Sequence, residues 1–138
     1  MLRLTAEVYA EVVAHALSGL PHEACGLLAA PVGAEQVTRF FPMRNAARSS
    51  RIYRFDEVEH LRAERTADAE GLALVAVMHS HTHTTAYPSP TDVHDASAFD
   101  PFGALLYVIV SLKDPEPALR CYRILNGAIA EEPVAVGE

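Results

Sequence analysis

The segment VMHSHTHTTAYPSPTDVHDA, residues 77–96, holds the side chains of this sequence that are best suited to chemistry. His79 and His81 lie two positions apart at the end of an apolar run, and Asp92 follows eleven residues after His81. Residues two apart on a strand project from the same face, so the two imidazoles can converge on one point. Two imidazoles and one carboxylate form a usual ligand set for catalytic zinc, which keeps a fourth position for water.

Each of these residues also has an ordinary interpretation. Histidines that follow a strand can be part of a polar, solvent-exposed loop. The run SPTD, residues 89–92, is typical of a helix N-terminus, with Ser89 as the cap and Asp92 completing a capping box. The two interpretations of Asp92 are compatible, because a cap would fix the carboxylate and orient it. His83 continues the alternation and is a third possible ligand, but we expect the strand to end at His81.

Glu23 stands at the start of a second apolar run, PHEACGLLAA. A glutamate at this position can simply face solvent at the mouth of a strand. Beside a metal site it becomes the candidate general base, because a metal hydrolase needs a group that removes a proton from water. Cys25 lies two positions later, and we expect it to be a small buried residue rather than a ligand.

Hydrophobic periodicity predicts the helices that must position these residues. We expect three helices, at residues 5–19, 56–70 and 91–99. Thr5 and Asp56 are suitable N-caps, and Gly19 and Gly71 are suitable residues to end the first two helices.

Short apolar or alternating runs predict strands at residues 24–30, 35–43, 50–55, 72–79, 103–112, 118–125 and 128–136. The run LALVAVMH is continuously apolar and predicts a strand buried on both faces. Asn126 and Gly127 predict a type I′ hairpin turn between the last two strands. Strands interleaved with helices indicate an α/β fold, with a mixed central sheet flanked by helices, in one domain over residues 1–138.

Composition narrows the possible partners and surroundings. A net charge of −7 argues against a nucleic-acid partner, which needs a basic face. The longest apolar runs are about half of the roughly 20 residues that span a bilayer, so we expect no membrane contact. Glu7 and Glu11 interrupt what would be a signal peptide. Cys25 and Cys121 have no CxxC partner, and we expect reduced thiols in a cytoplasmic protein.

Together these motifs resemble the JAMM (MPN+) metalloproteases, zinc peptidases that act on ubiquitin and ubiquitin-like tails. HSHTHTTAYPSPTD contains H-x-H-x7-S-x-x-D in register, and EACGLL supplies the upstream glutamate. The order of helices and strands is similar to that of a minimal MPN domain over nearly the whole chain. The family usually has proline after the second histidine, where this sequence has Thr82. In this respect the chain resembles the bacterial Mec-type CysO-cysteine peptidases, which cleave cysteine from a ubiquitin-like sulfur carrier.

The resemblance implies a role for each residue. His79, His81 and Asp92 would bind one zinc ion per chain, Glu23 would act as general base and then acid, and Ser89 would donate a hydrogen bond to the oxyanion. The implied partner is a sulfur-carrier protein that ends in diglycine. The implied product is cysteine, within a cysteine biosynthesis pathway.

The substrate contacts are predicted from general chemistry. An extended tail could pair with the predicted strand SRIYRF, residues 50–55, by β-augmentation. A free cysteine leaving group carries a carboxylate that needs a cation, and we choose Arg54 for it.

Three alternative functions share part of this pattern. A JAMM peptidase that trims or deconjugates another ubiquitin-like protein is the first, and a non-catalytic MPN scaffold is the second. The third, a zinc nucleobase deaminase, would need H-x-E and a later P-C-x-x-C, and the sequence has neither.

Overall fold

The computed structural model describes residues 1–137. Its elements, in chain order, are β1 (Leu2–Leu4), α1 (Ala6–Ser18), β2 (Cys25–Pro31), β3 (Gln36–Val37), β4 (Arg39–Met43), α2 (Glu57–Ala69), β5 (Leu72–His81), α3 (Pro90–Phe99), β6 (Leu106–Ser111), β7 (Ala118–Leu125), β8 (Ala128–Glu132) and β9 (Val134–Val136). The fold is α/β with a mixed central sheet, as predicted.

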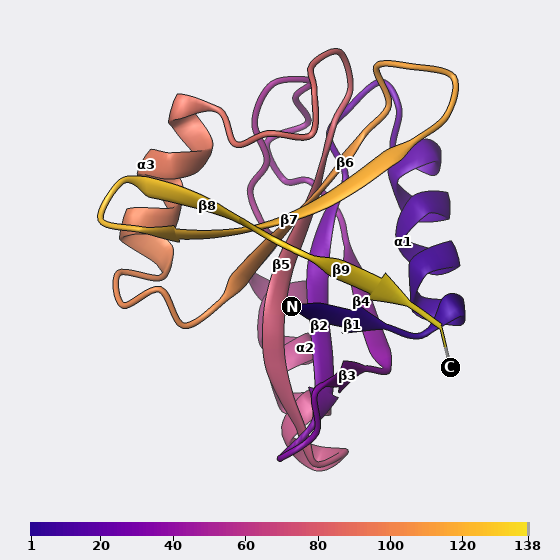
Figure 1. The fold of residues 1–138 in the computed structure, drawn as a ribbon, viewed down its shortest axis with the longest axis vertical. Helices are drawn as coiled ribbons and strands as arrows, with labels where there is room; N and C mark the ends of the chain where they lie inside the picture. The colour runs from indigo at the N-terminus through magenta and orange to yellow at the C-terminus, as the bar shows by residue number, and fades with distance from the viewer. Residues whose placement is uncertain (138) are drawn as a thin grey trace.

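Six strands form the large sheet, in the order β4-β2-β5-β6-β7-β8 (Figure 1). β5 and β6 are parallel and are connected through α3, whereas every other neighbouring pair in this sheet is antiparallel. A small parallel sheet, β3-β1-β9, crosses in front of β2 and β5. The parallel β5–α3–β6 connection places the start of α3 beside the end of β5.

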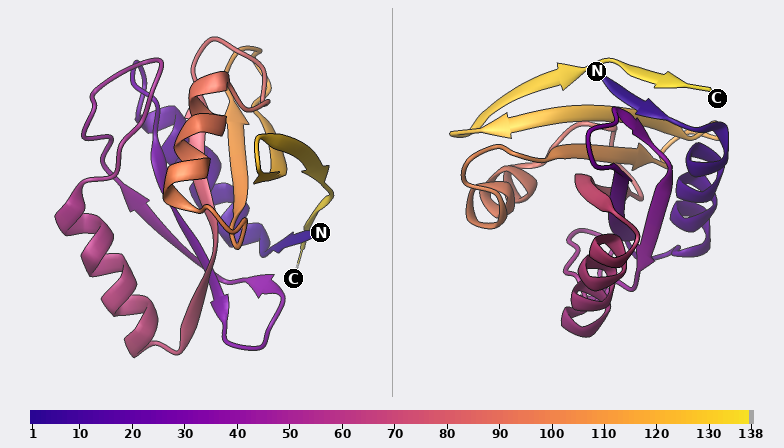
Figure 2. Two further views of the ribbon diagram at one scale, coloured as in Figure 1. Left: turned by 90° about the vertical axis from the view of Figure 1, so that its left-hand side faces the viewer. Right: turned by 90° about the horizontal axis from the view of Figure 1, so that it is seen from below.

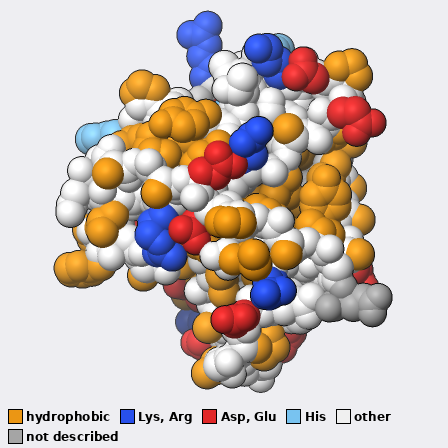
Figure 3. Space-filling model, viewed as in Figure 1, with side chains coloured by type: hydrophobic (Ala, Val, Ile, Leu, Met, Phe, Trp, Pro, Cys, Tyr) orange, Lys and Arg blue, Asp and Glu red, His pale blue; other side chains and the backbone are white. Residues whose placement is uncertain are grey.

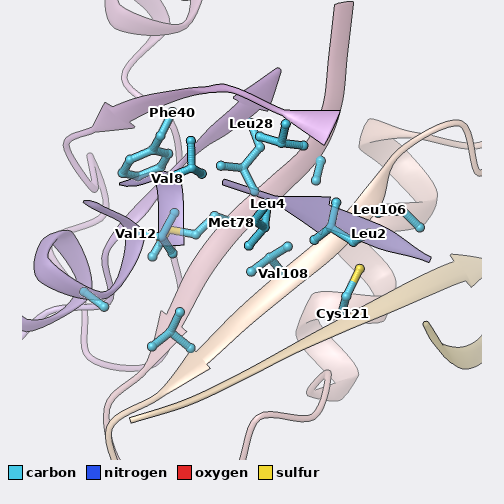
Figure 4. Packing of buried hydrophobic residues seen from close by; sticks show 14 of the residues in the cluster. Leu2, Leu4, Val8, Val12, Leu28, Phe40, Met78, Leu106, Val108 and Cys121 are labelled. Carbon is cyan, nitrogen blue, oxygen red and sulfur yellow. The ribbon is translucent and has the colours of Figure 1, made fainter. Parts of the chain in front are cut away.

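The large sheet lies between α1 on one side and α2 and α3 on the other (Figure 2). On the first side, a cluster of buried residues joins α1 and the small sheet to the large sheet (Figure 4). Met78 belongs to this cluster, and its neighbour Val77 belongs to the opposite cluster, which packs against α2 and α3. Because side chains alternate along a strand, His79 and His81 share the face of Val77. The two histidines therefore lie on the side of the sheet that α2 and α3 cover.

The helix and turn signals are confirmed. The Thr5 and Asp56 side chains accept hydrogen bonds from the first turns of α1 and α2. Ser89 caps α3 in a complete capping box. Asn126 and Gly127 both have positive φ, as a type I′ turn requires.

Residues 50–55 do not form the strand that was predicted for SRIYRF. Within residues 1–137, their one ladder contact is an isolated bridge between Asn45 and Phe55. The segment is instead a loop whose backbone groups bond to the Asn45 side chain. The expected edge for β-augmentation by a substrate tail is therefore wrong.

Other strand predictions need smaller corrections. The run 35–43 is divided into β3 and β4, and the run 128–136 is divided at Pro133. Proline has no N–H to donate to a ladder, and beyond it the chain leaves the large sheet to pair with β1. β1 itself was not predicted, because three residues are too short for a periodic signal. The first half of β5 is also partly exposed, and the strand is fully buried from Ala76 onward.

The two cysteines lie on opposite faces of the large sheet and are both free, as expected. No helix within residues 1–137 is long and apolar enough to cross a membrane. On the face seen in Figure 3, lysine and arginine side chains lie singly among acidic and hydrophobic ones.

Candidate metal centre

Two elements bring the three predicted ligands together in the interior. His79 and His81 are the last inward-facing residues of β5, and Asp92 lies in the first turn of α3. All three side chains are buried, with exposed fractions of 1%, 4% and 8%. Buried polar groups need partners, so such a cluster requires a physical explanation.

The three donor atoms form a nearly equilateral triangle. His79 Nε2 lies 3.2 Å from His81 Nε2, and Asp92 Oδ2 lies 3.1 Å and 3.0 Å from these two nitrogens. Metal–ligand bonds of about 2.0–2.1 Å in a tetrahedron give ligand–ligand edges of about 3.3 Å. The triangle therefore has the size of one face of a tetrahedral metal site.

Proton placement also favours a cation. His81 Nδ1 lies 2.8 Å from the carbonyl oxygen of Thr85, which can only accept, so Nδ1 carries the proton. In neutral His81, Nε2 then presents a lone pair to the Asp92 carboxylate and to His79. Lone pairs that face one another in a buried site repel unless a cation lies between them or an imidazole is protonated. The donor set fits a divalent metal ion, and the Thr85 bond fixes the ring of His81 for it.

Asp92 is held from its own helix. Its Oδ2 accepts a hydrogen bond from Ser89 N at 2.9 Å, and its backbone N–H donates to Ser89 Oγ at 3.0 Å. The helix cap thus orients the candidate ligand, so the capping interpretation is confirmed and remains compatible with a ligand role. Ser89 Oγ accepts the cap bond and keeps its own proton free to donate.

The field of the cluster shifts the pKa values of its members. Burial alone would raise the pKa of Asp92, but hydrogen bonds from His79 and His81 outweigh it and hold that pKa well below its usual range. Burial would lower the pKa of His81, yet the bonds to Asp92 and Thr85 raise it above 6.5.

Glu23 lies immediately before β2 and is 4% exposed. Its position is fixed through the next residue, because Ala24 N donates to Ser80 Oγ and Ala24 O accepts from Ser80 N. Burial raises the pKa of Glu23 to about 8, His81 acts to lower it and Asp92 to raise it. Glu23 therefore shares the electrostatic field of the metal cluster. Its Oε1 is buried and has no hydrogen-bond partner among the residues that the structure describes.

Asn45 organises the loop beside this site and was missed by sequence reasoning. Its amide nitrogen donates to the carbonyl oxygens of Glu23, Ser49 and Ile52. Its Oδ1 accepts from the backbone N–H groups of Ala47 and Arg54. Asparagine commonly binds nearby backbone in this way, which is the one signal the sequence offered. The loop that Asn45 holds places Tyr53 against His79, with ring centroids 4.4 Å apart.

The loop after β5 is fixed as well. Thr82, at the place of the family's proline, donates its hydroxyl proton to the carbonyl oxygen of Ser50. Tyr122 donates to the carbonyl oxygen of Ala86. These contacts join the loop to the Asn45 segment and to β7. The loop that follows the two histidines is therefore held at both of these points.

The remaining candidates lie outside the cluster. His83 and His94 are not among the buried residues, and the group of metal-ligating atoms contains neither. Cys25 is buried beside the carbonyl oxygens of Met43 and Arg44, and burial raises its pKa to about 12, as expected of a structural thiol.

Two hollows flank the Asn45 loop. One, of about 430 Å³, is lined by Tyr53, Arg54 and aromatic residues of the loop and of α3. The other, of about 460 Å³, is lined by Glu23 together with Arg44 and Arg48. The structure thus places Arg54 and Glu23 in different hollows.

Known proteins resemble this chain over most or all of its length. Residues 5–125 match the family model for prokaryotic homologs of the JAB domain. A CysO-cysteine peptidase from Mycobacterium tuberculosis is 45% identical over 139 residues, which cover 100% of this chain and 92% of that protein. A probable TtuB-protein conjugate cleaving protease from Thermus thermophilus is 38% identical over 87 residues, covering 62% of this chain and 57% of that protein.

A solution structure from Desulfitobacterium hafniense superposes with a TM-score of 0.88 at 34% sequence identity. The match covers 100% of this chain and 94% of the other. The fold is therefore shared with a solved protein along the full chain.

We predict that the triangle of His79, His81 and Asp92 binds one divalent ion in competition with protons. Because His81 has a raised pKa, the apparent affinity for zinc should rise with pH, by up to about tenfold per unit below that pKa. Chelator-competition titrations at pH 6, 7 and 8 measure this. His79→Ala should lose the ion, and His83→Ala and His94→Ala should keep it. Undiminished zinc in His79→Ala protein would contradict the assignment.

We predict that Asn45→Ala loosens the loop without removing the ligands. The loss of its hydrogen bonds should lower the free energy of unfolding by about 2–4 kcal/mol. Amide exchange at Ala47 and Arg54 should accelerate, while zinc content stays the same. Asp100→Ala is the matched control, because Asp100 is also buried and accepts from two backbone N–H groups in another loop. Equal exchange rates at Arg54 in the Asn45→Ala and wild-type proteins would refute the role.

Proposed function

This chain belongs to the JAB/MPN family and is a hydrolase of its JAMM peptidase type, and from that premise we propose a specific reaction. The proposed enzyme is a zinc peptidase that hydrolyses the bond after the C-terminal glycine of a ubiquitin-like sulfur carrier and releases cysteine. The observation that carries this proposal is the buried triangle of ligand atoms beside an unpartnered Glu23 carboxyl oxygen. A base next to a metal-ligand set is what peptide hydrolysis by water requires.

The protein residues divide the reaction between them. A zinc ion held by His79, His81 and Asp92 would supply Lewis acidity and bring the pKa of water to about 7. Glu23 takes a proton from the attacking water and returns it to the leaving amine. In the metal-free protein burial raises the pKa of Glu23 to about 8, and a bound cation would lower that pKa toward the range in which Glu23 can accept a proton and return it.

Ser89 is the proposed donor to the oxyanion. The Ser89 hydroxyl oxygen already accepts from Asp92 N, which fixes its place at the helix N-terminus. Its proton is then free to bond to the oxygen on which charge develops. The helix N-terminus adds a favourable potential for that charge.

The names of the relatives support the proposed substrate. The mycobacterial relative is called a CysO-cysteine peptidase, and it is similar over the full chain. We infer cysteine as the leaving group and a diglycine-ending carrier as the partner, within cytoplasmic cysteine biosynthesis. The two free, buried thiols agree with a reducing compartment.

The Thermus relative's name favours a second candidate, a peptidase that cleaves conjugates of another ubiquitin-like protein. A non-catalytic scaffold is less well supported, because the ligand set and Glu23 are complete.

We predict that the zinc-loaded protein removes one cysteine from a CysO–cysteine adduct and that chelator stops the reaction. Glu23→Gln should retain zinc and lose about 10²–10⁴-fold in rate, because the amide cannot exchange the proton. Glu57→Gln, at an exposed site on α2, is the matched carboxyl-to-amide control. Mass spectrometry of the carrier gives the result. An unchanged carrier mass with active-site zinc present would refute the substrate, and near-normal turnover by Glu23→Gln would refute the base.

The same substitution should change stability in a pH-dependent way. In the metal-free protein, the pKa of Glu23 is about 8 when folded and 4.5 in the reference state. The folded state thus binds more protons between these values, and its stability falls as pH rises through that window. Metal-free Glu23→Gln should therefore melt at a higher temperature than the wild type at pH 8 and at a similar one at pH 4. Calorimetry in chelator measures the difference.

We predict that Ser89 has a catalytic role beyond its cap. Ser89→Ala should lower kcat by about 10²–10³-fold, the usual effect of removing one oxyanion donor. Thr5→Ala removes the matching cap bond of α1, which costs about 1 kcal/mol, and should leave turnover unchanged. Glycine is tolerated at an N-cap, so Ser89→Gly should be less destabilised than Ser89→Ala. Because it also lacks the hydroxyl group, it should be as inactive as Ser89→Ala. Substantial activity in Ser89→Gly would assign Ser89 to capping alone.

A further inference from the structure

The hollow on the Glu23 side of the Asn45 loop is cationic in a protein whose net charge is −7. Its lining includes two arginines and two histidines, together with Glu23 and Asn45; the basic and imidazole residues are Arg44, Arg48, His15 and His22. A concave site lined by several N–H donors, two of them guanidinium groups, can bind an anion.

Most of these groups already have partners. The guanidinium of Arg44 bonds to Asp56 at 2.9 Å. His15 Nε2 bonds to the carbonyl oxygens of Cys25 and Met43. No ion pair or side-chain hydrogen bond within residues 1–137 involves the Arg48 guanidinium, and the residue is exposed. Arg48 is therefore the cation available to a ligand.

The backbone of Arg48 adopts a conformation that arginine takes rarely. Arg48 has φ of 47°, in the left-handed region, and its N–H closes a turn onto Asn45 O at 3.1 Å. Within residues 1–137, every other residue with positive φ is glycine or asparagine, the types that adopt this conformation most easily. Arginine is thus placed where glycine would be less strained, and such strain often marks a functional position.

Arg48 is also tied to Glu23. The residue after it, Ser49, accepts a hydrogen bond from Glu23 N at 2.8 Å, and the Asn45 amide bonds to both Glu23 O and Ser49 O. In a free amino acid, the carboxyl carbon lies about 2.5 Å from the amine nitrogen. If Glu23 returns its proton to that nitrogen, the carboxylate of the leaving group must lie near Glu23.

We propose that this hollow binds the α-carboxylate of the leaving amino acid, with the Arg48 guanidinium as its cation. This inference rests on the proposed peptidase function and adds a preference for a single amino acid over a longer chain. An amide or peptide bond at the same place would leave Arg48 unpaired. The site therefore distinguishes removal of one terminal residue from cleavage of a larger conjugate. Arg54, chosen from the sequence, lines the other hollow and stays the competing prediction.

The test compares two substrates, a CysO–cysteine adduct and the same carrier ending in cysteine amide, which lacks the charge. Wild-type protein should prefer the free carboxylate by about 10- to 100-fold in kcat/KM, mostly through KM, as expected for one charge-assisted contact. Arg48→Asn, which tolerates positive φ, should cleave both substrates at similar rates. Its melting temperature should equal or exceed that of the wild type. Arg62→Gln, on the exposed surface of α2, is the charge control and should keep the preference.

The outcomes separate the two hypotheses. Cleavage of neither substrate by the zinc-loaded wild type would overturn the proposed CysO–cysteine substrate, on which this inference rests. Equal cleavage of both by the wild type would overturn the carboxylate site and leave the peptidase standing. Loss of the preference in Arg54→Asn but not in Arg48→Asn would move the carboxylate to the other hollow and overturn the assignment of Arg48.

Discussion

The structure depends on one electrostatic constraint, the mutual repulsion of three electron-pair donors that are held together out of water. Two imidazole nitrogens and a carboxylate oxygen lie within 3.0–3.2 Å of one another. In a medium of low dielectric constant this arrangement is unfavourable until a positive charge enters. The protein nevertheless fixes it from independent sides, by the strand that carries the histidines and by the cap of α3. The fold therefore supplies the energy that keeps a metal-binding geometry ready.

The Asn45 loop shows how one buried side chain can organise a site without contacting its chemistry. Five hydrogen bonds convert a segment of alternating sequence into a wall between two hollows. On one side of the wall Tyr53 stacks on His79, and on the other side Arg48 lines the same hollow as Glu23. The wall therefore has two chemically different sides, one lined by aromatic residues and the other by arginines.

The ligand set could be predicted because its chemistry is local. His79, His81 and Asp92 lie within fourteen residues, and strand alternation and a capping box suffice to bring them together. The loop at residues 50–55 could not be predicted in this way. Its apolar residues Ile52, Tyr53 and Phe55 line a neighbouring hollow, and Tyr53 also stacks on His79, whereas the segment's pairing is limited to one isolated bridge at Phe55.

The same limit explains the other errors. Whether a backbone N–H bonds to a strand or to a distant asparagine is decided by tertiary structure, and periodicity does not record it. β1 and β9 are each three residues long, and they are strands because they pair with each other. Arg54 was chosen by its place in the sequence and stays a prediction, and the sequence also did not show that Arg48 and Arg54 line different hollows.

The stacking of Tyr53 on His79 has an optical consequence. The chain has no tryptophan and five tyrosines, so its intrinsic ultraviolet emission comes chiefly from phenol rings. One of these fluorophores lies face to face with a ring of the ligand triangle. A paramagnetic ion such as Cu²⁺ bound at the triangle should quench the fluorescence of Tyr53 more than that of the other tyrosines. The intensity of tyrosine emission would then report how much of the protein has bound the ion.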